Sequence, residues 1–163
     1  MNILRIGTHT LPLPSYAHPG DAGLDLAARI AGAPLRSWNA WGEELDIRGY
    51  LERGDAVLLA PSWRIIIPCG FAVELPPGHC GTVRPRSSCF KRGLGVALGT
   101  VDEGYRGEIL IGVYNLGSAP VRIEHGERIA QLVVSPVARV EVLEVDALSE
   151  TARGAGALGS TGR

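Results

Sequence analysis

Short apolar runs, which recur at roughly ten-residue intervals from Asp55 onward, restrict the fold of this chain more than any other feature. Almost every gap between these runs contains Gly, Pro, Asn or Asp, the residues that favour turns. The runs are rich in Val, Ile and Leu, and no stretch keeps a 3.6-residue period over a dozen residues. They cover residues 56–60, 64–67, 70–75, 80–84, 94–98, 108–114, 120–123, 128–134 and 137–145. The pattern predicts an all-β chain, either a sandwich or a closed barrel.

Two of these runs support more detailed expectations. In residues 137–145 apolar and polar positions alternate, with Arg139 between Val137 and Val140, which predicts a strand. The run at 108–114 predicts a strand that is buried on both faces.

Composition limits the class of protein. The chain has 163 residues, which suits one domain with a substantial core. Its hydrophobic fraction is 45%, its charged fraction 20% and its formal net charge -1, so there is no overall basic field to attract nucleic acid. No apolar run is long enough to span a bilayer, and the N-terminus lacks the layout of a signal peptide. We therefore expect a cytoplasmic protein that binds neither nucleic acid nor membrane.

Residues 28–53 depart from the strand pattern and are expected to be an insertion. They include Trp38 and Trp41 among polar and small residues, a composition compatible with a short helix. Because large aromatic side chains favour burial, the tryptophans predict that the insertion packs against the body. Residues 1–152 are expected to form the domain, and residues 153–163 a separate tail.

The tail is rich in glycine. Closely spaced glycines let successive backbone N–H groups converge on an anion, and Arg153, Ser160 and Thr161 add a charge and two hydroxyls. A Walker-type loop needs a Gly-Lys-Ser/Thr step between a strand and a helix, but the only lysine is Lys91. The tail is therefore expected to bind a triphosphate as a flexible segment, and not as a P-loop.

The densest polar cluster of the chain begins with Arg84-Pro-Arg-Ser-Ser88. This turn carries two guanidinium groups and two hydroxyls, a set suited to neutralising and orienting phosphate oxygens. The next polar segment, residues 99–108, predicts a tight hairpin whose inner glycines permit positive φ. Asp102 and Tyr105 lie near the tip of this hairpin.

Together these segments resemble the trimeric dUTP pyrophosphatase (dUTPase) family, whose five motifs occur here in the family's order. The resemblance covers nearly all of the chain except the insertion. The motifs are Ala22-Gly-Leu-Asp-Leu26, Arg84-Pro-Arg-Ser-Ser88, Gly99-Thr-Val-Asp-Glu-Gly-Tyr-Arg-Gly107, Gly126-Glu-Arg-Ile-Ala-Gln-Leu132 and the tail. The resemblance implies a jelly-roll-like β-barrel and a homotrimer whose active sites are shared between subunits.

The resemblance also implies an activity: hydrolysis of dUTP to dUMP and pyrophosphate, which lowers dUTP and supplies dUMP for dTMP synthesis. Asp102 matches the carboxylate that orients and deprotonates the water attacking the α-phosphorus. Tyr105 matches the ring that packs on the deoxyribose and excludes a 2′-hydroxyl. Mg²⁺ is expected to be held by the phosphates and waters, with Asp25 reaching it through water.

Further substrate contacts are implied in the same way. The main chain of the hairpin is expected to pair with the uracil edge, and the residues assigned to the base are Val96, Thr100, Val101 and Leu110. The residues assigned to the phosphates are Arg86, Ser87, Ser88, Gln131, Arg153, Gly156, Ser160 and Thr161. Leu158 stands where the family usually has Phe, and it is expected to cover the base more weakly than a stacked ring.

Two other functions compete with this one. The related dCTP deaminase needs a glutamate ten positions beyond the hairpin aspartate, where this chain has Gly112. A regulatory protein that binds dUTP with slow turnover is the second alternative, and the departure at Leu158 keeps it open.

Overall fold

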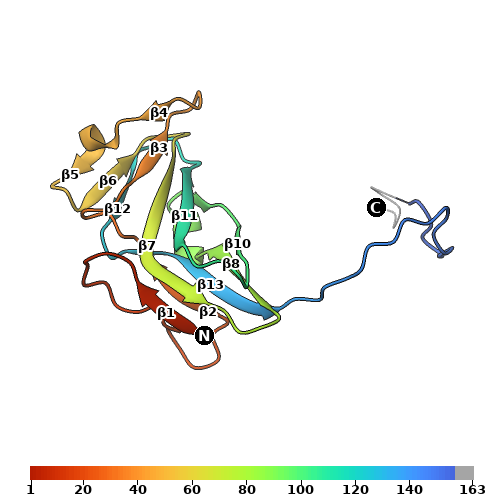
Figure 1. Cartoon of the computed structure of the whole chain (residues 1–163). Helices are drawn as coiled ribbons and strands as arrows, with labels where there is room; N and C mark the ends of the chain where they lie inside the picture. Colours follow the sequence, from red (N-terminus) through yellow and green to blue (C-terminus); the bar gives the residue numbers. More distant parts are fainter. Residues whose placement is uncertain (157–163) are drawn as a thin grey trace.

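The computed structural model describes residues 1–156, and they are almost entirely β-structure (Figure 1). The strands are β1 (Asn2–Arg5), β2 (Gly23–Ala27), β3 (Arg36–Trp38), β4 (Glu44–Leu45), β5 (Leu51–Glu52), β6 (Ala56–Leu59), β7 (Arg64–Glu74), β8 (His79–Pro85), β9 (Leu94–Val96), β10 (Gly99–Val101), β11 (Glu108–Asn115), β12 (Val121–Glu124) and β13 (Arg128–Pro136). The helical elements are the 3-10 helix η1 (Ile47–Tyr50) and the helix α1 (Ser87–Lys91). Within this part of the chain, no helix is long and apolar enough to cross a membrane.

Antiparallel pairing arranges the strands in sheets. The largest has the order β4-β3-β7-β11-β9, with β1 also paired to β7. The second has the order β10-β8-β13-β2, and the third β12-β6-β5. Neighbouring strands are mostly not consecutive in the chain, as in jelly rolls. The prediction of an all-β, jelly-roll-like fold is confirmed.

The core lies between the sheets. Alternate residues of a strand point to opposite faces, and the inward set is apolar in both larger sheets. The largest buried side chains include Ile67 and Phe71 of β7, Ile111 of β11, and Ile129 and Leu132 of β13. Burial of such side chains stabilises the fold by about 1.5–3 kcal/mol each.

Strand β11 is buried on one face only. Alternate residues from Ile109 to Val113 are buried, whereas Leu110 and Tyr114 are exposed on the other face. The expectation that residues 108–114 are buried on both faces is therefore wrong for the single chain. An antiparallel sheet needs only one covered face, and here the outer face remains open to a partner or to water.

Residues 99–108 do not form the predicted hairpin. Strand β10 pairs with β8, whereas β11 pairs with β7 and β9. The segment 102–107 is therefore a loop that carries the chain from one sheet to the other. Gly104 and Gly107 do not have positive φ, because strands that separate do not require the tight turn of a hairpin.

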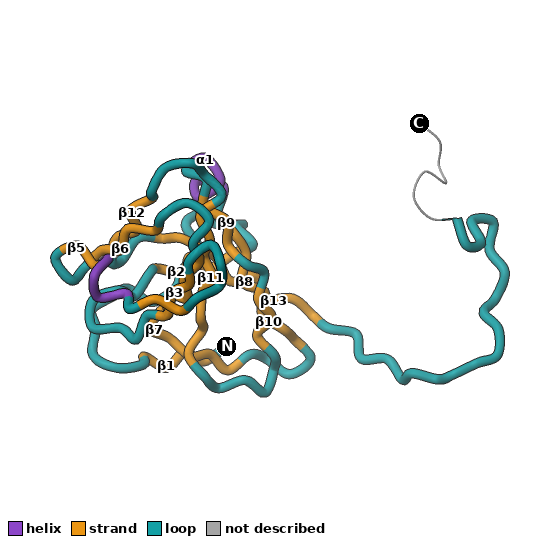
Figure 2. Tube along the Cα trace, turned by 90° about the horizontal axis from the view of Figure 1, so that it is seen from above, coloured by secondary structure: helices purple, strands orange, loops and turns teal. Residues whose placement is uncertain are grey.

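The predicted strand at 137–145 is absent. After β13 the backbone makes one more hydrogen bond to the body, from the Val137 N–H to the Gly78 carbonyl oxygen at 2.8 Å. Val140 and Val142 are 79% and 88% exposed, and the segment runs away from the body (Figure 2). A strand needs a neighbour for its backbone hydrogen bonds, and this segment has left both neighbours of β13.

The insertion at 28–53 forms the short strands β3, β4 and β5 and one short helix, the 3-10 helix η1. Strand β3 extends the largest sheet by pairing with β7. Trp38 is half-buried, with the Arg36 guanidinium 5.2 Å from its ring centroid. Trp41 is 85% exposed, so its predicted burial is wrong. It lies in a turn where the Asn39 side-chain oxygen accepts a hydrogen bond from the Trp41 N–H at 3.0 Å.

Candidate active site

Three of the sequence motifs meet in one pocket of about 300 Å³, which we call the arginine pocket. Asp25 lies on β2, Gln131 on β13, and Arg86 and Ser87 where β8 passes into α1. Pairing brings them together because β13 lies between β2 and β8, with Gln131 opposite both Asp25 and Arg84. Side chains far apart in the sequence thus share one face of the second sheet.

Two guanidinium groups flank the carboxylate of Asp25. Oδ2 of Asp25 lies 3.2 Å from Nη1 of Arg86 and 3.0 Å from Nη1 of Arg128. Two cations and one anion leave the arrangement positively charged, which suits phosphate oxygens. The sequence did not predict the contact between Arg128 and Asp25, because 103 positions separate the two residues.

Gln131 lies over Gly23. Its Nε2 donates a hydrogen bond to the Pro85 carbonyl oxygen at 2.9 Å. A Cβ atom at Gly23 would overlap the Gln131 carboxamide and lie 3.0 Å from the Gln131 Cβ. The glycine of the first motif therefore makes room for the glutamine of the fourth.

Asp102 lies in a second pocket, of about 290 Å³, which we call the Asp102 pocket. Thr100 and Asp102 border it from β10 and the following loop, Cys80 from β8, and Val137 and Arg139 from the segment after β13. The Asp102 side chain is exposed, so it can reach a ligand or a water molecule.

Hydrogen bonds hold the loop that carries Asp102. The Glu103 carboxylate accepts hydrogen bonds from the Gly78 N–H at 3.0 Å and from Arg139 at 2.9 Å. The Tyr105 N–H donates to the Asp102 carbonyl oxygen at 3.0 Å. The Tyr105 ring is 41% exposed and is free to pack against a ligand.

The two pockets lie far apart in the chain. Val101 of β10 is opposite Gly81 of β8, so Asp102 comes level with Cys80 at the start of β8. Arg86 lies just past the other end of this strand. At the rise of a β-strand, the six residue steps from Cys80 to Arg86 span roughly 20 Å. A single chain therefore does not bring Asp102 and Arg86 to the same phosphate group.

The other predicted residues differ in exposure. Thr100 and Leu110 are exposed, and Ser88 is exposed in the first turn of α1. Val96 and Val101 are buried.

Part of the predicted site falls on the C-terminal segment. Arg153 and Gly156 are exposed and lie beyond the body, where Nε of Arg153 donates to the Gly156 carbonyl oxygen at 3.1 Å. Leu158, Ser160 and Thr161 lie outside the described residues.

The buried cysteines are not candidates for a nucleophile. Burial raises the pKa of the Cys69 thiol to about 12, and burial also raises the pKa of the Cys89 thiol. Since the thiolate is the reactive form, both are inert at neutral pH.

Sequence comparison assigns the family. The family model described as dUTPase matches residues 51–162. The deoxyuridine 5'-triphosphate nucleotidohydrolase of Methylocella silvestris is 43% identical over 155 residues, which are 93% of this chain and 84% of the relative. The chain belongs to the dUTPase family.

Solved structures of the family have the same fold. The dUTPase of Staphylococcus bacteriophage 80alpha, in a variant solved with dUpNHpp, is 24% identical with a TM-score of 0.78, and the match covers 99% of this chain and 98% of that chain. A variant of the dUTPase from phage phi11 of S. aureus, described with a structural Mg(II) ion, is 19% identical with a TM-score of 0.70. That match covers 91% of this chain and 98% of that chain.

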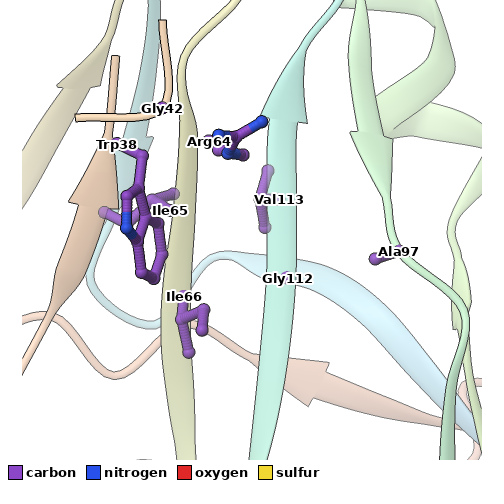
Figure 3. Close-up of a pocket in the computed structure, with 8 residues that line it drawn as sticks. All are labelled: Trp38, Gly42, Arg64, Ile65, Ile66, Ala97, Gly112 and Val113. Carbon is purple, nitrogen blue, oxygen red and sulfur yellow. The ribbon is translucent and has the colours of Figure 1, made fainter. Parts of the chain in front are cut away.

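A third pocket, of about 370 Å³, lies on the outer face of the largest sheet (Figure 3). It contains none of the predicted site residues. Gly112 of β11 borders it beside Ala97, at the position where a dCTP deaminase needs its glutamate. Among the described residues that line it, none is acidic.

The donor set suits a metal ion held mainly by a nucleotide. In residues 1–156, no group of three His, Cys, Asp or Glu side chains lies close enough together to hold a metal ion. Mg²⁺ in nucleotide sites is typically bound by one or two carboxylates, phosphates and water. Both arginine contacts of Asp25 involve Oδ2, so its other oxygen can bind a metal-bound water.

Proposed function

We propose that the chain hydrolyses dUTP to dUMP and pyrophosphate in a site shared between subunits, with Asp102 as the general base. Membership of the dUTPase family supports the activity, and the chain is accordingly a dUTP nucleotidohydrolase. The observation that supports the shared site is the separation of Asp102 from Arg86 within one subunit.

The chemistry is in-line displacement at the α-phosphorus. Asp102 accepts a proton from a water molecule whose oxygen forms a bond to that phosphorus. The bond between the α-phosphorus and its bridging oxygen to the β-phosphate breaks, and pyrophosphate leaves. Tyr105 packs against the deoxyribose and leaves no room for a 2′-hydroxyl. The backbone at Thr100 and Val101 reads the uracil edge, with Val96 and Leu110 beside it.

The arginine pocket binds the phosphates. Arg86, Ser87 and Ser88 contact the α- and β-phosphates, and Gln131 lies beside them. The tail supplies further phosphate contacts and covers the base with Leu158. Its phosphate-binding residues are Arg153, Gly156, Ser160 and Thr161. Closure of such a segment excludes bulk water from the reaction.

Mg²⁺ fits beside Asp25. When bound, the ion offsets phosphate charge and favours a single triphosphate conformation for in-line attack. Asp25 would hold it through a water molecule, while Arg86 and Arg128 keep the carboxylate in position.

Three features support a homotrimer in which neighbouring subunits complete each site. Asp102 and Arg86 lie too far apart to serve one nucleotide in a single subunit. The alternating segment 137–145 has no strand partner among residues 1–156. Phe90 and Leu116 are exposed apolar side chains on the body, and a subunit contact would cover them.

Product analysis with dUTP, dCTP, dTTP and UTP, each with Mg²⁺, tests the proposal. We expect pyrophosphate from dUTP only. Ammonia from dCTP would identify a deaminase, and binding of dUTP without any product would identify a regulatory protein.

Gly23→Ala is expected to raise KM for dUTP by about tenfold, with little loss of stability. The new methyl group must displace the Gln131 carboxamide, the flexible end of a side chain, from the phosphates. Loss of one such hydrogen bond is worth about 1.5 kcal/mol when the acceptor is charged. Steady-state kinetics and thermal unfolding measure both effects. Gly49→Ala is the matched control, since nothing lies within 4 Å of its added Cβ. An unchanged KM in Gly23→Ala would remove Gln131 from the phosphate site.

Leu158→Phe is expected to tighten dUTP binding about tenfold. An aromatic ring stacks on a base with about 1–3 kcal/mol, more than the apolar contact of leucine. Calorimetric titration with a non-hydrolysable dUTP analogue measures the Kd. An equal or weaker affinity would contradict the stacking role of this position.

A further inference from the structure

We propose that the buried ion pair between Arg29 and Glu108 positions Tyr105 and the Asp102 loop, so that Glu108 is a positioning residue for discrimination against the 2′-hydroxyl. The inference rests on the proposed roles of Asp102 and Tyr105. Neither Arg29 nor Glu108 belongs to the residues that contact the nucleotide in the proposed function.

The contact is a well-formed clamp. Nε of Arg29 donates to Oε1 of Glu108 at 3.1 Å, and Nη2 donates to Oε2 at 3.0 Å. The Gly70 N–H donates to Oε1 at 2.7 Å. The two charged side chains are only 8% and 14% exposed. Charge-assisted bidentate bonds of this kind define both distance and direction.

The clamp joins three parts of the fold. Arg29 follows β2, and its own N–H donates to the Pro68 carbonyl oxygen of β7 at 2.9 Å. Gly70 also belongs to β7 and has a φ of 87°, which orients its N–H toward the carboxylate. Glu108 is the first residue of β11, directly after the loop. The clamp therefore fixes the C-terminal end of the loop to the largest sheet.

Glu108 also holds Tyr105 directly. The Tyr105 hydroxyl donates to the Glu108 carbonyl oxygen at 3.0 Å. The ring lies over Gly107, where any added Cβ would overlap it. Since the Tyr105 N–H is bonded to the Asp102 carbonyl oxygen, a shift of Glu108 would move both the ring and the base.

Stability alone does not account for this pair. Desolvation of two buried charges costs about as much as their attraction returns, and apolar residues of similar volume often stabilise a core equally well. The pair lies where the loop enters the sheet, which is where a defined direction benefits the site.

The test compares Glu108→Gln and Arg29→Met with the wild-type chain at full length. The readouts are kcat and KM for dUTP, kcat/KM for UTP, and the melting temperature. We expect the preference for dUTP over UTP to fall about tenfold in both variants, because small displacements of a positioned group have large kinetic effects. A lower melting temperature with an unchanged preference would assign the pair a purely structural role and overturn the proposal.

Arg36 and Glu44 are the matched control. They form an equally bidentate pair at 2.8 and 3.1 Å, but their side chains are 60% and 51% exposed and lie on β3 and β4. Arg36→Met and Glu44→Gln are expected to leave the preference unchanged. An equal loss of preference in these controls would also overturn the proposal.

Two further measurements keep the proposal testable. One is used if the first variants do not fold, and the other if the wild-type chain does not hydrolyse dUTP. Arg29→Lys keeps the charge but loses the bidentate geometry, and we expect it to lose part of the preference. Binding of dUMP against UMP, by calorimetry, reports the same discrimination without turnover. Wild-type turnover of dUTP tests the proposed function separately. A preference for dUMP that is equal in wild type, Arg29→Lys and Glu108→Gln would contradict the clamp even if the wild type proved inactive.

Discussion

Asp102→Asn is expected to lower kcat for dUTP by about 10³-fold while the Kd for a non-hydrolysable dUTP analogue stays close to that of the wild type. General bases contribute about 10²–10⁴-fold to such reactions, and the amide cannot accept the proton of the attacking water. The loop should keep its shape, because its contacts use the Asp102 carbonyl oxygen and the Glu103 carboxylate, not the Asp102 side chain.

Single-turnover kinetics separates the chemical step from binding in this variant. Asp146→Asn, in the exposed segment beyond β13, is a control of identical chemistry and should retain wild-type kcat. Retention of wild-type kcat by Asp102→Asn would mean that another group activates the water. A parallel loss of binding would instead assign Asp102 to substrate affinity.

The strands after residue 55 were predictable because each of those runs shows its apolar pattern within a few neighbouring residues. Every apolar run from 56–60 to 128–134 overlaps a strand of the structure. Strands β1 to β5 lie outside the predicted runs. Three of them, β3, β4 and β5, have only two or three residues, which are too few to show a period. At 137–145 the error was the reverse, because a strand was predicted where the structure has none. The apolar and polar residues do alternate there, but a strand also needs a hydrogen-bonded neighbour, which the local sequence does not determine.

For the candidate site, too, the sequence identified residues but not their positions in space. The motifs identified Asp102, Arg86 and Gln131, but not that Asp102 lies in a different pocket from the other two. The ion pair of Arg29 with Glu108 spans 79 positions and produces no local pattern. Such pairs depend on which strands become neighbours, and only the folded chain determines that.

Mixing two inactive variants is expected to restore activity. Arg86→Gln removes a cation that neutralises phosphate charge, and we expect it to lose about 10²-fold or more in kcat. Asp102→Asn lacks the base. We assume that each site takes Asp102 from one subunit and Arg86 from its neighbour, as in a heterologous trimer. In an equal mixture of the two variants, about a quarter of the sites should then contain both intact residues.

The mixture is prepared by unfolding both variants together, refolding them, and measuring dUTP hydrolysis per subunit. Asp102→Asn mixed with the double variant Asp102→Asn, Arg86→Gln is the control, and it should stay inactive because no subunit carries the base. Recovery in the first mixture alone requires the two pockets to meet across a subunit boundary. No recovery from a mixture that does form hybrid trimers would place Asp102 and Arg86 in one subunit's site, against the separation of about 20 Å that strand geometry gives.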